Sequence, residues 1–332
     1  LFGLLNVAVA LWALWLFRSQ LPGIVWLRGQ GIAALLALLV AFAGAGELTA
    51  LAEAHLYTDE IVHAESSPYQ RIVVTRWKDD LRLHLNNNLQ FSSRDEYRYH
   101  EALVHPGLAA LPGARRVLVL GGGDGLAVRE ILKYPQVESV TLVDLDPAMT
   151  QLFSTAPALT ALNEKAFASP KVTVINADAL VWLEDNRERF DFVVVDFPDP
   201  SNFSIGKLYS AAFYRLLEKH LSESGLAVVQ STSPLYARQS FWCVVTTIES
   251  VGFVATPYHA LVPSFGEWGF VLVGRRGYRA PETYPVATRF LTPALTPSLF
   301  EFPKDMARVD AEVNQLNNQV LVRYFEREWR HV

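Results

Sequence analysis

The chain has 332 residues, of which 51% are hydrophobic, and a formal net charge of −5 at pH 7. The acidic balance argues against nucleic acid as a partner, because proteins that bind a duplex usually present a basic patch. The single cysteine, Cys243, excludes a disulfide framework and a cysteine-based zinc site within one chain.

Much of the apolar content lies before residue 55. Residues 1–17 and 32–46 form two apolar runs, and the second continues less purely through residues 48–56. Because a helix needs about 20 apolar residues to cross the hydrocarbon core, we expect residues 1–54 to be a membrane segment. It would hold two transmembrane helices, or one together with an interfacial helix. This predicts contact with membrane lipid in a multi-pass protein of the inner cell membrane, with further sequence before Leu1.

Residues 55–93 carry short β patterns. Residues 71–76 and 80–85 are rich in β-branched or alternating side chains, and a turn is expected at residues 86–88. We predict a small antiparallel β subdomain here.

Residues 94–275 alternate helices with short apolar strands. A first helix is expected over residues 94–111, ended by Pro112-Gly113. The strands that follow are expected at residues 116–120, 139–143, 172–176, 190–195, 226–230, 253–258 and 269–274, with helices between them, one of them over residues 207–221. This alternation predicts an α/β fold with a parallel, Rossmann-like sheet of the class I methyltransferase type. Residues 276–332 are Pro-rich, then helical, and form an extension of unknown role.

Candidate site residues follow the strands, because ligands in open parallel sheets bind beyond the carboxyl ends of the strands. Gly121-Gly122-Gly123-Asp124-Gly125 follows the first strand, and the close backbone approach that Gly121 and Gly123 allow favours a ligand there. A Gly-rich segment can also be only a tight turn. Its spacing departs from G-x-G-x-x-G at Leu126, and Asp124 would repel a pyrophosphate but suit a cationic group.

Acidic residues follow the next two strands as well. Asp144 lies about 20 residues past the glycines, the position that binds ribose hydroxyls. The cap of the following helix is assigned to Asp146 rather than to Asp144. Asp178-Ala179 follows the third strand, and Asp178 can accept from an adenine amino group or cap a helix, with neither favoured.

The fourth strand is followed by Asp196 and Asp199, on a loop stiffened by two prolines. With Asp124 they predict three carboxylates in one cleft, which is costly unless a cation neutralises them. A polyamine is such a cation. A metal ion is the alternative, but no histidine partner is evident, so we expect no metal site.

These motifs resemble the spermidine synthases. Together with Ser67-Pro68-Tyr69-Gln70 and residues 94–101 they occur in that family's order and spacing, and the resemblance covers residues 57–275. It implies transfer of an aminopropyl group to a polyamine, by default putrescine, giving spermidine and methylthioadenosine. The donor, decarboxylated S-adenosylmethionine, is a co-substrate, and no prosthetic group is implied. The apolar N-terminus resembles a membrane-anchored branch of the family, and a homo-oligomer is expected.

The resemblance also implies a role for each matched residue. Residues on the donor side would bind decarboxylated S-adenosylmethionine: Gln70, Gly121, Gly123, Asp124, Asp144, Asp178 and Ala179. Tyr99 and Asp196 would orient and deprotonate the attacking amine, and His100, Asp199 and Glu267 would bind the acceptor. Without the resemblance, Tyr99 is equally well explained by core packing and Gln70 as a solvated strand residue.

Two segments depart from the family pattern, both on the acceptor side. Pro263 stands where a tyrosine is common, and residues 201–207 lack a Gly-Pro-rich gate and add Lys207. The identity of the acceptor is therefore the least constrained part of the prediction.

Two other functions compete. An S-adenosylmethionine methyltransferase would share the fold, but such enzymes usually carry an acid just before the glycines, where Leu120 stands. A non-catalytic, membrane-bound polyamine or nucleoside sensor would not need Tyr99 and Asp196 together. Because the donor nucleotide is made in the cytoplasm, the catalytic domain is expected there, although Arg18 and Arg28 between the apolar runs favour the opposite orientation.

Overall fold

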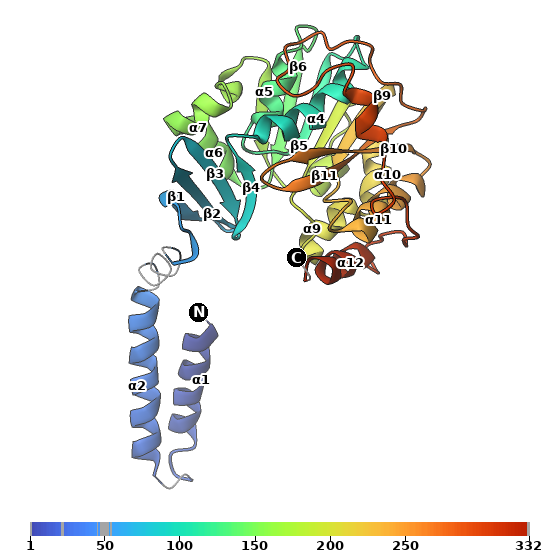
Figure 1. Cartoon of the computed structure of the whole chain (residues 1–332). Helices are drawn as coiled ribbons and strands as arrows, with labels where there is room; N and C mark the ends of the chain where they lie inside the picture. Colours follow the sequence, from blue (N-terminus) through green and yellow to red (C-terminus); the bar gives the residue numbers. More distant parts are fainter. Residues whose placement is uncertain (1, 21–22, 45, 47–52, 54, 331–332) are drawn as a thin grey trace. The chain divides into compact units, whose positions relative to one another are not determined.

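The computed structural model describes residues 2–20, 23–44, 46, 53 and 55–330. The chain divides into two compact units, one formed by residues 1–62 with 75–77 and the other by residues 63–74 with 78–332. The first unit contains α1 (Phe2–Leu16) and α2 (Ile24–Ala43), which run side by side (Figure 1).

The prediction of a multi-pass membrane protein is wrong. Within the described part of the chain, α2, with 20 residues, is the one helix long and apolar enough to cross a membrane. The described part of α1 is apolar and has 15 residues. The expected continuation through residues 48–56 includes residues outside those described. The expected cytoplasmic placement of the catalytic domain was part of the same localisation prediction and is not retained.

The predicted small antiparallel sheet is present. Its strands are β1 (Glu60–Ser66), β2 (Arg71–Trp77), β3 (Asp80–Leu85) and β4 (Asn88–Ser92), in that spatial order. The turn between β3 and β4 has positive φ at Asn86 and Asn87, a residue type that tolerates the left-handed region. Apolar side chains of β2, β3 and β4 pack on α6 (Pro147–Thr155) and α7 (Pro157–Leu162).

The large sheet has seven strands in the order β10-β11-β9-β8-β5-β6-β7. Their bounds are β5 (Arg116–Gly121), β6 (Ser139–Asp144), β7 (Val172–Asn176), β8 (Phe190–Asp196), β9 (Leu221–Gln230), β10 (Val254–Val262) and β11 (Gly266–Gly274). Strands β5 to β9 are mutually parallel, whereas β11 runs antiparallel to both β9 and β10, so the predicted Rossmann-like sheet is mixed at this edge. The short turn between β10 and β11 is the reason, since only antiparallel neighbours can be joined so tightly.

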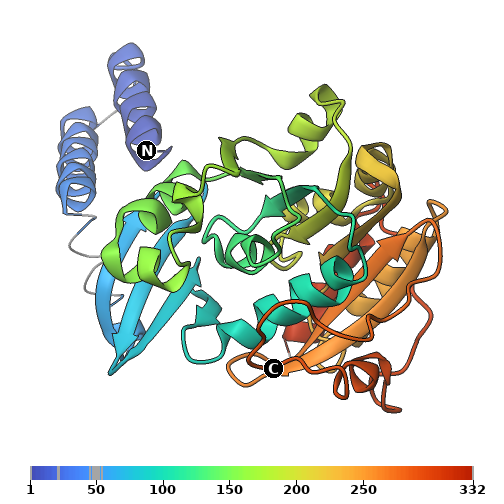
Figure 2. The ribbon, with the colours of Figure 1, turned by 90° about the horizontal axis from the view of Figure 1, so that it is seen from above.

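Helices cover both faces of this sheet (Figures 1 and 2). They are α4 (Glu96–Ala109), α5 (Leu126–Leu132), α8 (Ala179–Asp185), α9 (Phe203–Gly206), α10 (Ala211–His220), α11 (Arg238–Glu249) and α12 (Val320–Trp329). Side chains of β5 alternate between the faces: Leu118 and Leu120 pack toward α8, α10 and α11, whereas Val117 and Val119 pack toward α4 and α5. The order of strands reverses at β5, which makes its carboxyl end the expected ligand crevice.

Two element predictions need correction. The helix expected from residue 207 begins at Ala211, because Lys207–Tyr209 form a 3₁₀ turn and Ser210 caps α10. The strand expected from residue 226 begins at Leu221. In the C-terminal extension, a long irregular segment leads to α12, which packs on α11.

Candidate functional site

The glycine turn after β5 brings backbone and carboxylates into close contact. Gly121 has φ +82° and pairs with Asp196 of β8, and a Cβ atom on it would lie 2.3 Å from the Asp196 carbonyl oxygen. A Cβ on Gly123 would lie 2.7 Å from Oδ2 of Asp144, and the Gly123 N–H donates to that oxygen at 3.0 Å. Both positions require glycine, so the turn is shaped by its acidic neighbours.

Asp144 ends β6 and is fixed by two backbone donors. Its Oδ2 accepts from Gly123 N–H and its Oδ1 from Asp146 N–H at 2.8 Å. Burial raises the pKa of its carboxyl to about 6, against these hydrogen bonds. The carboxylate therefore lies beside the glycine turn, where the sequence placed the ribose contact.

Asp124 closes the turn at the start of α5. Its Oδ1 accepts from the N–H of Leu126, the first residue of α5, at 2.9 Å. Burial raises the pKa of the Asp124 carboxyl, while the nearby His100 lowers it. A cationic ligand would relieve the cost of this half-buried charge.

Tyr99 and Asp196 meet directly, 97 residues apart in the chain. The Tyr99 hydroxyl donates to Asp196 Oδ1 at 2.5 Å. Burial and the charge of Asp124 raise the pKa of the Asp196 carboxyl to about 6, whereas His100 and the Tyr99 hydroxyl lower it. Burial and Asp196 raise the pKa of Tyr99 well above its usual value, so Tyr99 stays a hydrogen-bond donor. Asp196 is thus a carboxylate poised to take a proton near neutral pH.

Asp199 lies three residues further, on the loop that follows β8. Burial raises the pKa of its carboxyl to about 7, although Gln230 and Thr232 act to lower it. The Gln230 amide lies 3.4 Å from Asp199 Oδ1, donates to the Phe197 carbonyl at 2.6 Å and accepts from the Trp268 indole at 3.1 Å. Gln230 therefore ties the acidic loop to β9 and β11.

The sequence analysis missed Gln230, although its position offered a signal. It ends the fifth strand of the domain at the same edge as the predicted carboxylates. Tyr209 was missed as well, and its hydroxyl donates to the carbonyls of Phe197 and Pro198 at 3.1 and 3.2 Å. A tyrosine in a connecting segment carries no comparable sequence signal.

Asp178 has two partners. Its Oδ1 accepts from the first N–H groups of α8, Leu180 at 2.9 Å and Val181 at 3.5 Å, and Ala179 is the first residue of that helix. Lys207 Nζ donates to its Oδ2 at 2.6 Å. Burial acts to raise the pKa of Asp178, but the Lys207 ammonium outweighs it and the pKa is lowered. Asp178 therefore caps α8, one of its two predicted roles, and its other oxygen contacts Lys207, the cation that departs from the family pattern.

Gln70 and Glu267 form their hydrogen bonds with Asp146 and His259. The Gln70 amide donates to Asp146 Oδ2 at 2.9 Å, so this residue reaches the loop after β6. The Glu267 carboxylate lies 2.5 Å from His259 Nδ1. Since neighbouring strand residues face opposite sides, Trp268 rather than Glu267 shares a side with Phe270, whose ring packs on Tyr99. Both assigned roles remain predictions.

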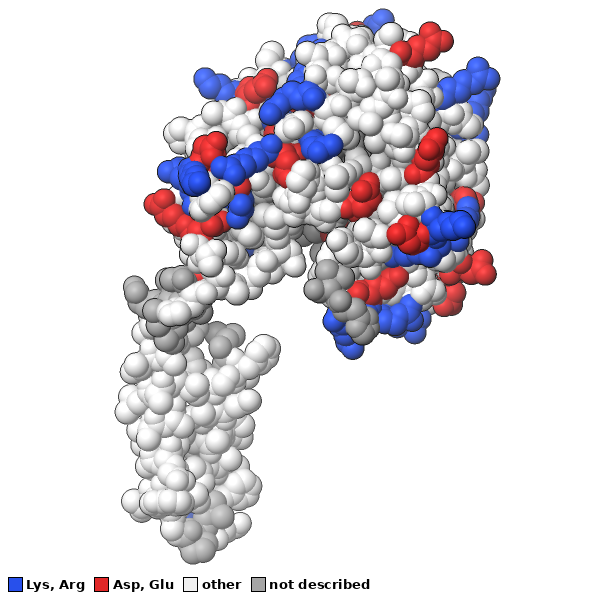
Figure 3. Space-filling model, viewed as in Figure 1, with Lys and Arg blue, Asp and Glu red and all other residues white. Residues whose placement is uncertain are grey.

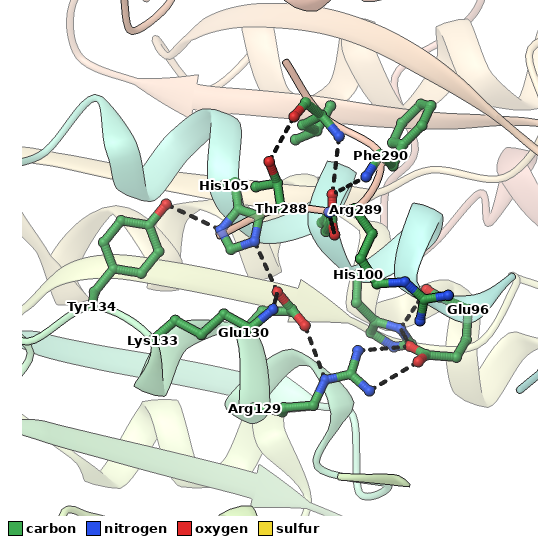
Figure 4. Close-up of polar contacts among 12 residues, drawn as sticks. Glu96, His100, His105, Arg129, Glu130, Lys133, Tyr134, Thr288, Arg289 and Phe290 are labelled. Carbon is green, nitrogen blue, oxygen red and sulfur yellow. Dashed lines mark hydrogen bonds and ion pairs between the residues drawn. The ribbon is translucent and has the colours of Figure 1, made fainter. Parts of the chain in front are cut away.

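His100 is buried on α4, beside Tyr99. Its Nδ1 atom is 2.8 Å from both the carbonyl oxygen and Oε2 of Glu96, and its ring packs edge-on against Tyr99. Figure 4 shows the row of charged side chains that continues from Glu96 under α4. Among the residues that the structure describes, no group of three or more potential metal ligands is gathered.

Comparisons with known proteins agree on one family. Residues 96–281 match the family described as "Spermine/spermidine synthase domain". The whole chain aligns at 61% identity with polyamine aminopropyltransferase 2 of Ralstonia nicotianae and covers 66% of that protein. It also aligns over its whole length, at 54% identity, with the polyamine aminopropyltransferase of Leptospira interrogans and covers 67% of it. The chain thus spans about two thirds of the length of these relatives.

Solved structures show the same fold. The crystal structure of spermidine synthase from Thermotoga maritima has a TM-score of 0.67 at 22% identity, over 74% of this chain and 87% of that one. A spermidine synthase in complex with the transition state analogue AdoDATO has a TM-score of 0.68 at 22% identity, over 74% of this chain and 88% of its own. At this identity the likeness establishes the fold.

Proposed function

Because this chain belongs to the spermine/spermidine synthase family, we propose that it transfers the aminopropyl group of decarboxylated S-adenosylmethionine to a polyamine, by default putrescine. The observation that carries this proposal is the hydrogen bond of 2.5 Å between Tyr99 and Asp196, set among the carboxylates of Asp124 and Asp199. The products are an aminopropylated amine and methylthioadenosine.

The proposed chemistry needs one base and good alignment. The nitrogen of a neutral amine attacks the carbon next to the sulfonium, the carbon–sulfur bond breaks, and its electrons neutralise the sulfur. The amine proton goes to Asp196. Tyr99 holds Oδ1, so we assign Oδ2 as the oxygen that takes the proton. A pKa of about 6 leaves Asp196 ionised at neutral pH yet basic enough to help. Positioning by the surrounding loops supplies further rate.

The donor side is assigned from the glycine turn outward. Asp124 would pair with the amine of the aminopropyl group, Asp144 with the ribose hydroxyls and Asp178 with the adenine amino group. Gly121, Gly123 and Ala179 would allow the backbone to approach the nucleoside, and Gln70 would contact the methionine-derived part. On the acceptor side we assign His100, Asp199 and Glu267.

The base assignment is tested with Asp196→Asn. We expect turnover to fall by about 10²- to 10⁴-fold, the usual contribution of a general base, while methylthioadenosine binding by calorimetry stays within a few fold. Asp191→Asn is the matched control. It lies on the same strand, where its Oδ2 accepts from Arg115 and Arg116 N–H groups far from the site. Equal rates for Asp196→Asn and the unmodified protein would rule out Asp196 as the base.

The reaction class is tested by mass spectrometry of the products. The purified protein is incubated with either decarboxylated or ordinary S-adenosylmethionine and a panel of diamines and triamines. Methylthioadenosine with an aminopropylated amine supports the proposal and names the acceptor. S-adenosylhomocysteine would indicate a methyltransferase, and binding without any product would indicate a sensor.

We also propose that α2 contacts membrane lipid. Arg28 is its one charged residue, none of its described side chains is buried, and Figure 3 shows little charge on the visible surface of α1 and α2. Flotation with lipid vesicles should recover the protein, and the double variant Leu36→Asp, Val40→Asp should float less.

A homo-oligomer is proposed from the family alone. Analytical ultracentrifugation in detergent that shows only monomer would dismiss it.

A further inference from the structure

A row of charged side chains, most of them buried, joins α4 to α5 (Figure 4), and its His100 ring packs against Tyr99 of the proposed active site. His100 is 3% exposed and Glu96, one helical turn earlier, is 2% exposed. Both atoms within 2.8 Å of His100 Nδ1, the Glu96 carbonyl oxygen and Oε2, are acceptors. Nδ1 must therefore carry a proton, and Nε2 lies on the other side of the ring.

Glu96 is fixed from its far side by α5. Arg129 donates from Nη1 to Oε1 and from Nη2 to Oε2 of Glu96, both at 2.9 Å, which is the planar two-bond pairing that guanidinium favours. Its Nε donates to Glu130 at 2.9 Å, and Nη1 also donates to the Leu162 carbonyl at 2.9 Å. Glu96 thus has little freedom to leave His100.

Two carboxylates and two cations of this row pair with one another. Glu96 and Glu130 face Arg129 and Lys133, whose Nζ lies 2.6 Å from Glu130 Oε2. His105 closes the row through contacts with Glu130 and the Tyr134 hydroxyl. The charges of Glu96, Glu130, Arg129 and Lys133 balance one another, so they do not cancel a positive charge on His100.

The groups that face His100 come from four parts of the fold. They are Glu96 and Tyr99 on α4, Asp124 in the glycine turn, Arg129 on α5, and Asp196 at the end of β8. Burial opposes protonation of His100, but the hydrogen bond and charge of Glu96 outweigh it and, with Asp124 and Asp196, raise its pKa. In return His100 lowers the pKa of Asp124 and of Asp196.

We infer that Glu96 and Arg129 are positioning residues that hold His100 as an imidazolium facing Asp124 and Asp196, and so keep Asp196 ionised before the amine binds. The inference rests on the proposed function, since it assigns what prepares the base. Without this cation, the carboxylates of Asp124 and Asp196 would raise each other's pKa and the base would be protonated at a higher pH.

The test is the pH dependence of kcat/KM together with an NMR titration of the His100 ring. In Glu96→Gln, the pKa of His100 should fall, and the acidic limb of the profile should move up by about one pH unit. That shift lowers the rate at pH 6 by about fivefold and leaves the rate at pH 8.5 nearly unchanged. His100→Gln, which keeps the pair of Glu96 and Arg129, should move the limb in the same direction. Adding Glu96→Gln to it should give no further shift.

Glu101→Gln is the matched control. Glu101 is also buried on α4, but its carboxylate accepts from the backbone N–H groups of Arg289, Phe290 and Leu291. It should lower the melting temperature without moving the acidic limb. The inference is overturned if Glu101→Gln moves the limb as much as Glu96→Gln, or if neither Glu96→Gln nor His100→Gln moves it. The NMR titration reads the charge of His100 even if the protein transfers no aminopropyl group, so failure of the proposed function is distinguishable from failure of this inference.

Discussion

Gly121→Ala is the substitution that most directly tests how the fold builds this site. The new Cβ atom would lie 2.3 Å from the carbonyl oxygen and 2.9 Å from the carbonyl carbon of Asp196. Both are backbone atoms of β8 and cannot swing aside as a side chain would. The position also has φ +82°, a conformation that alanine adopts only at a cost.

The expected magnitude has two parts. The left-handed backbone costs about 1–2 kcal/mol, and overpacking a rigid core typically costs about 1–3 kcal/mol more. Reaching even a tight contact of 3.0 Å requires the Asp196 carbonyl to move by roughly 0.7 Å. Because a misplacement of about 1 Å can cost about 10²-fold in rate, we expect kcat to fall by roughly that factor.

Urea unfolding and steady-state kinetics on the same preparation check this prediction. Gly252→Ala is the matched control, because Gly252 has φ +93° but a Cβ atom there would have no atom of the described residues within 4 Å. In this control the free energy of unfolding should fall only by the cost of the left-handed backbone, about 1–2 kcal/mol, and kcat should stay unchanged. If Gly121→Ala loses no more stability than Gly252→Ala and keeps its turnover, the contact with Asp196 does not position the base.

Three further substitutions have outcomes that the structure fixes. In the folded protein the pKa of Asp199 is about 7, whereas the unfolded chain releases this proton near pH 4. The free energy of unfolding therefore falls as the pH rises through 7. Asp199→Asn should unfold at a higher urea concentration than the unmodified protein at pH 8 but not at pH 4. Asn314→Ala removes buried hydrogen bonds to the carbonyls of Gly206 and Tyr209, at 3.0 and 3.1 Å, and should lower the free energy of unfolding by about 2–4 kcal/mol in urea titrations. Asp95→Ala releases the backbone and hydroxyl of Ser264 between β10 and β11, and should raise KM for the amine severalfold with a smaller change in KM for the donor nucleotide.

Much of the fold follows from local sequence pattern. The alternation of short apolar strands and helices placed β5 to β8 within one residue, and the central strands β5 and β8 are almost wholly buried and read as continuous apolar runs. The same rule put Asp124, Asp144 and Asp196 at one edge of the sheet. The antiparallel edge escaped this reasoning, since β10 and β11 carry apolar runs as parallel strands do and only their short turn sets their direction.

Side-chain partners could not be read from the sequence in the same way. The Gln70 contact with Asp146 joins residues 76 positions apart, and Gln230 reaches a loop 31 to 33 positions away. Such pairs depend on how the small sheet and the loops pack, and no local pattern encodes that geometry. The sequence therefore predicted which carboxylates gather, but not which neutral and cationic groups hold them.

Asp178 shows how two alternatives from the sequence can both hold. One carboxylate oxygen caps α8, and the other accepts from Lys207. Because a carboxylate has about four acceptor positions, capping does not prevent contact with a purine amino group. An amino group at Oδ2 must, however, compete with the ammonium. Lys207→Met should therefore tighten methylthioadenosine binding severalfold by calorimetry, whereas Lys219→Met, at an exposed position on α10, should leave it unchanged. Weaker binding by Lys207→Met would mean instead that Lys207 orients Asp178 for the nucleobase.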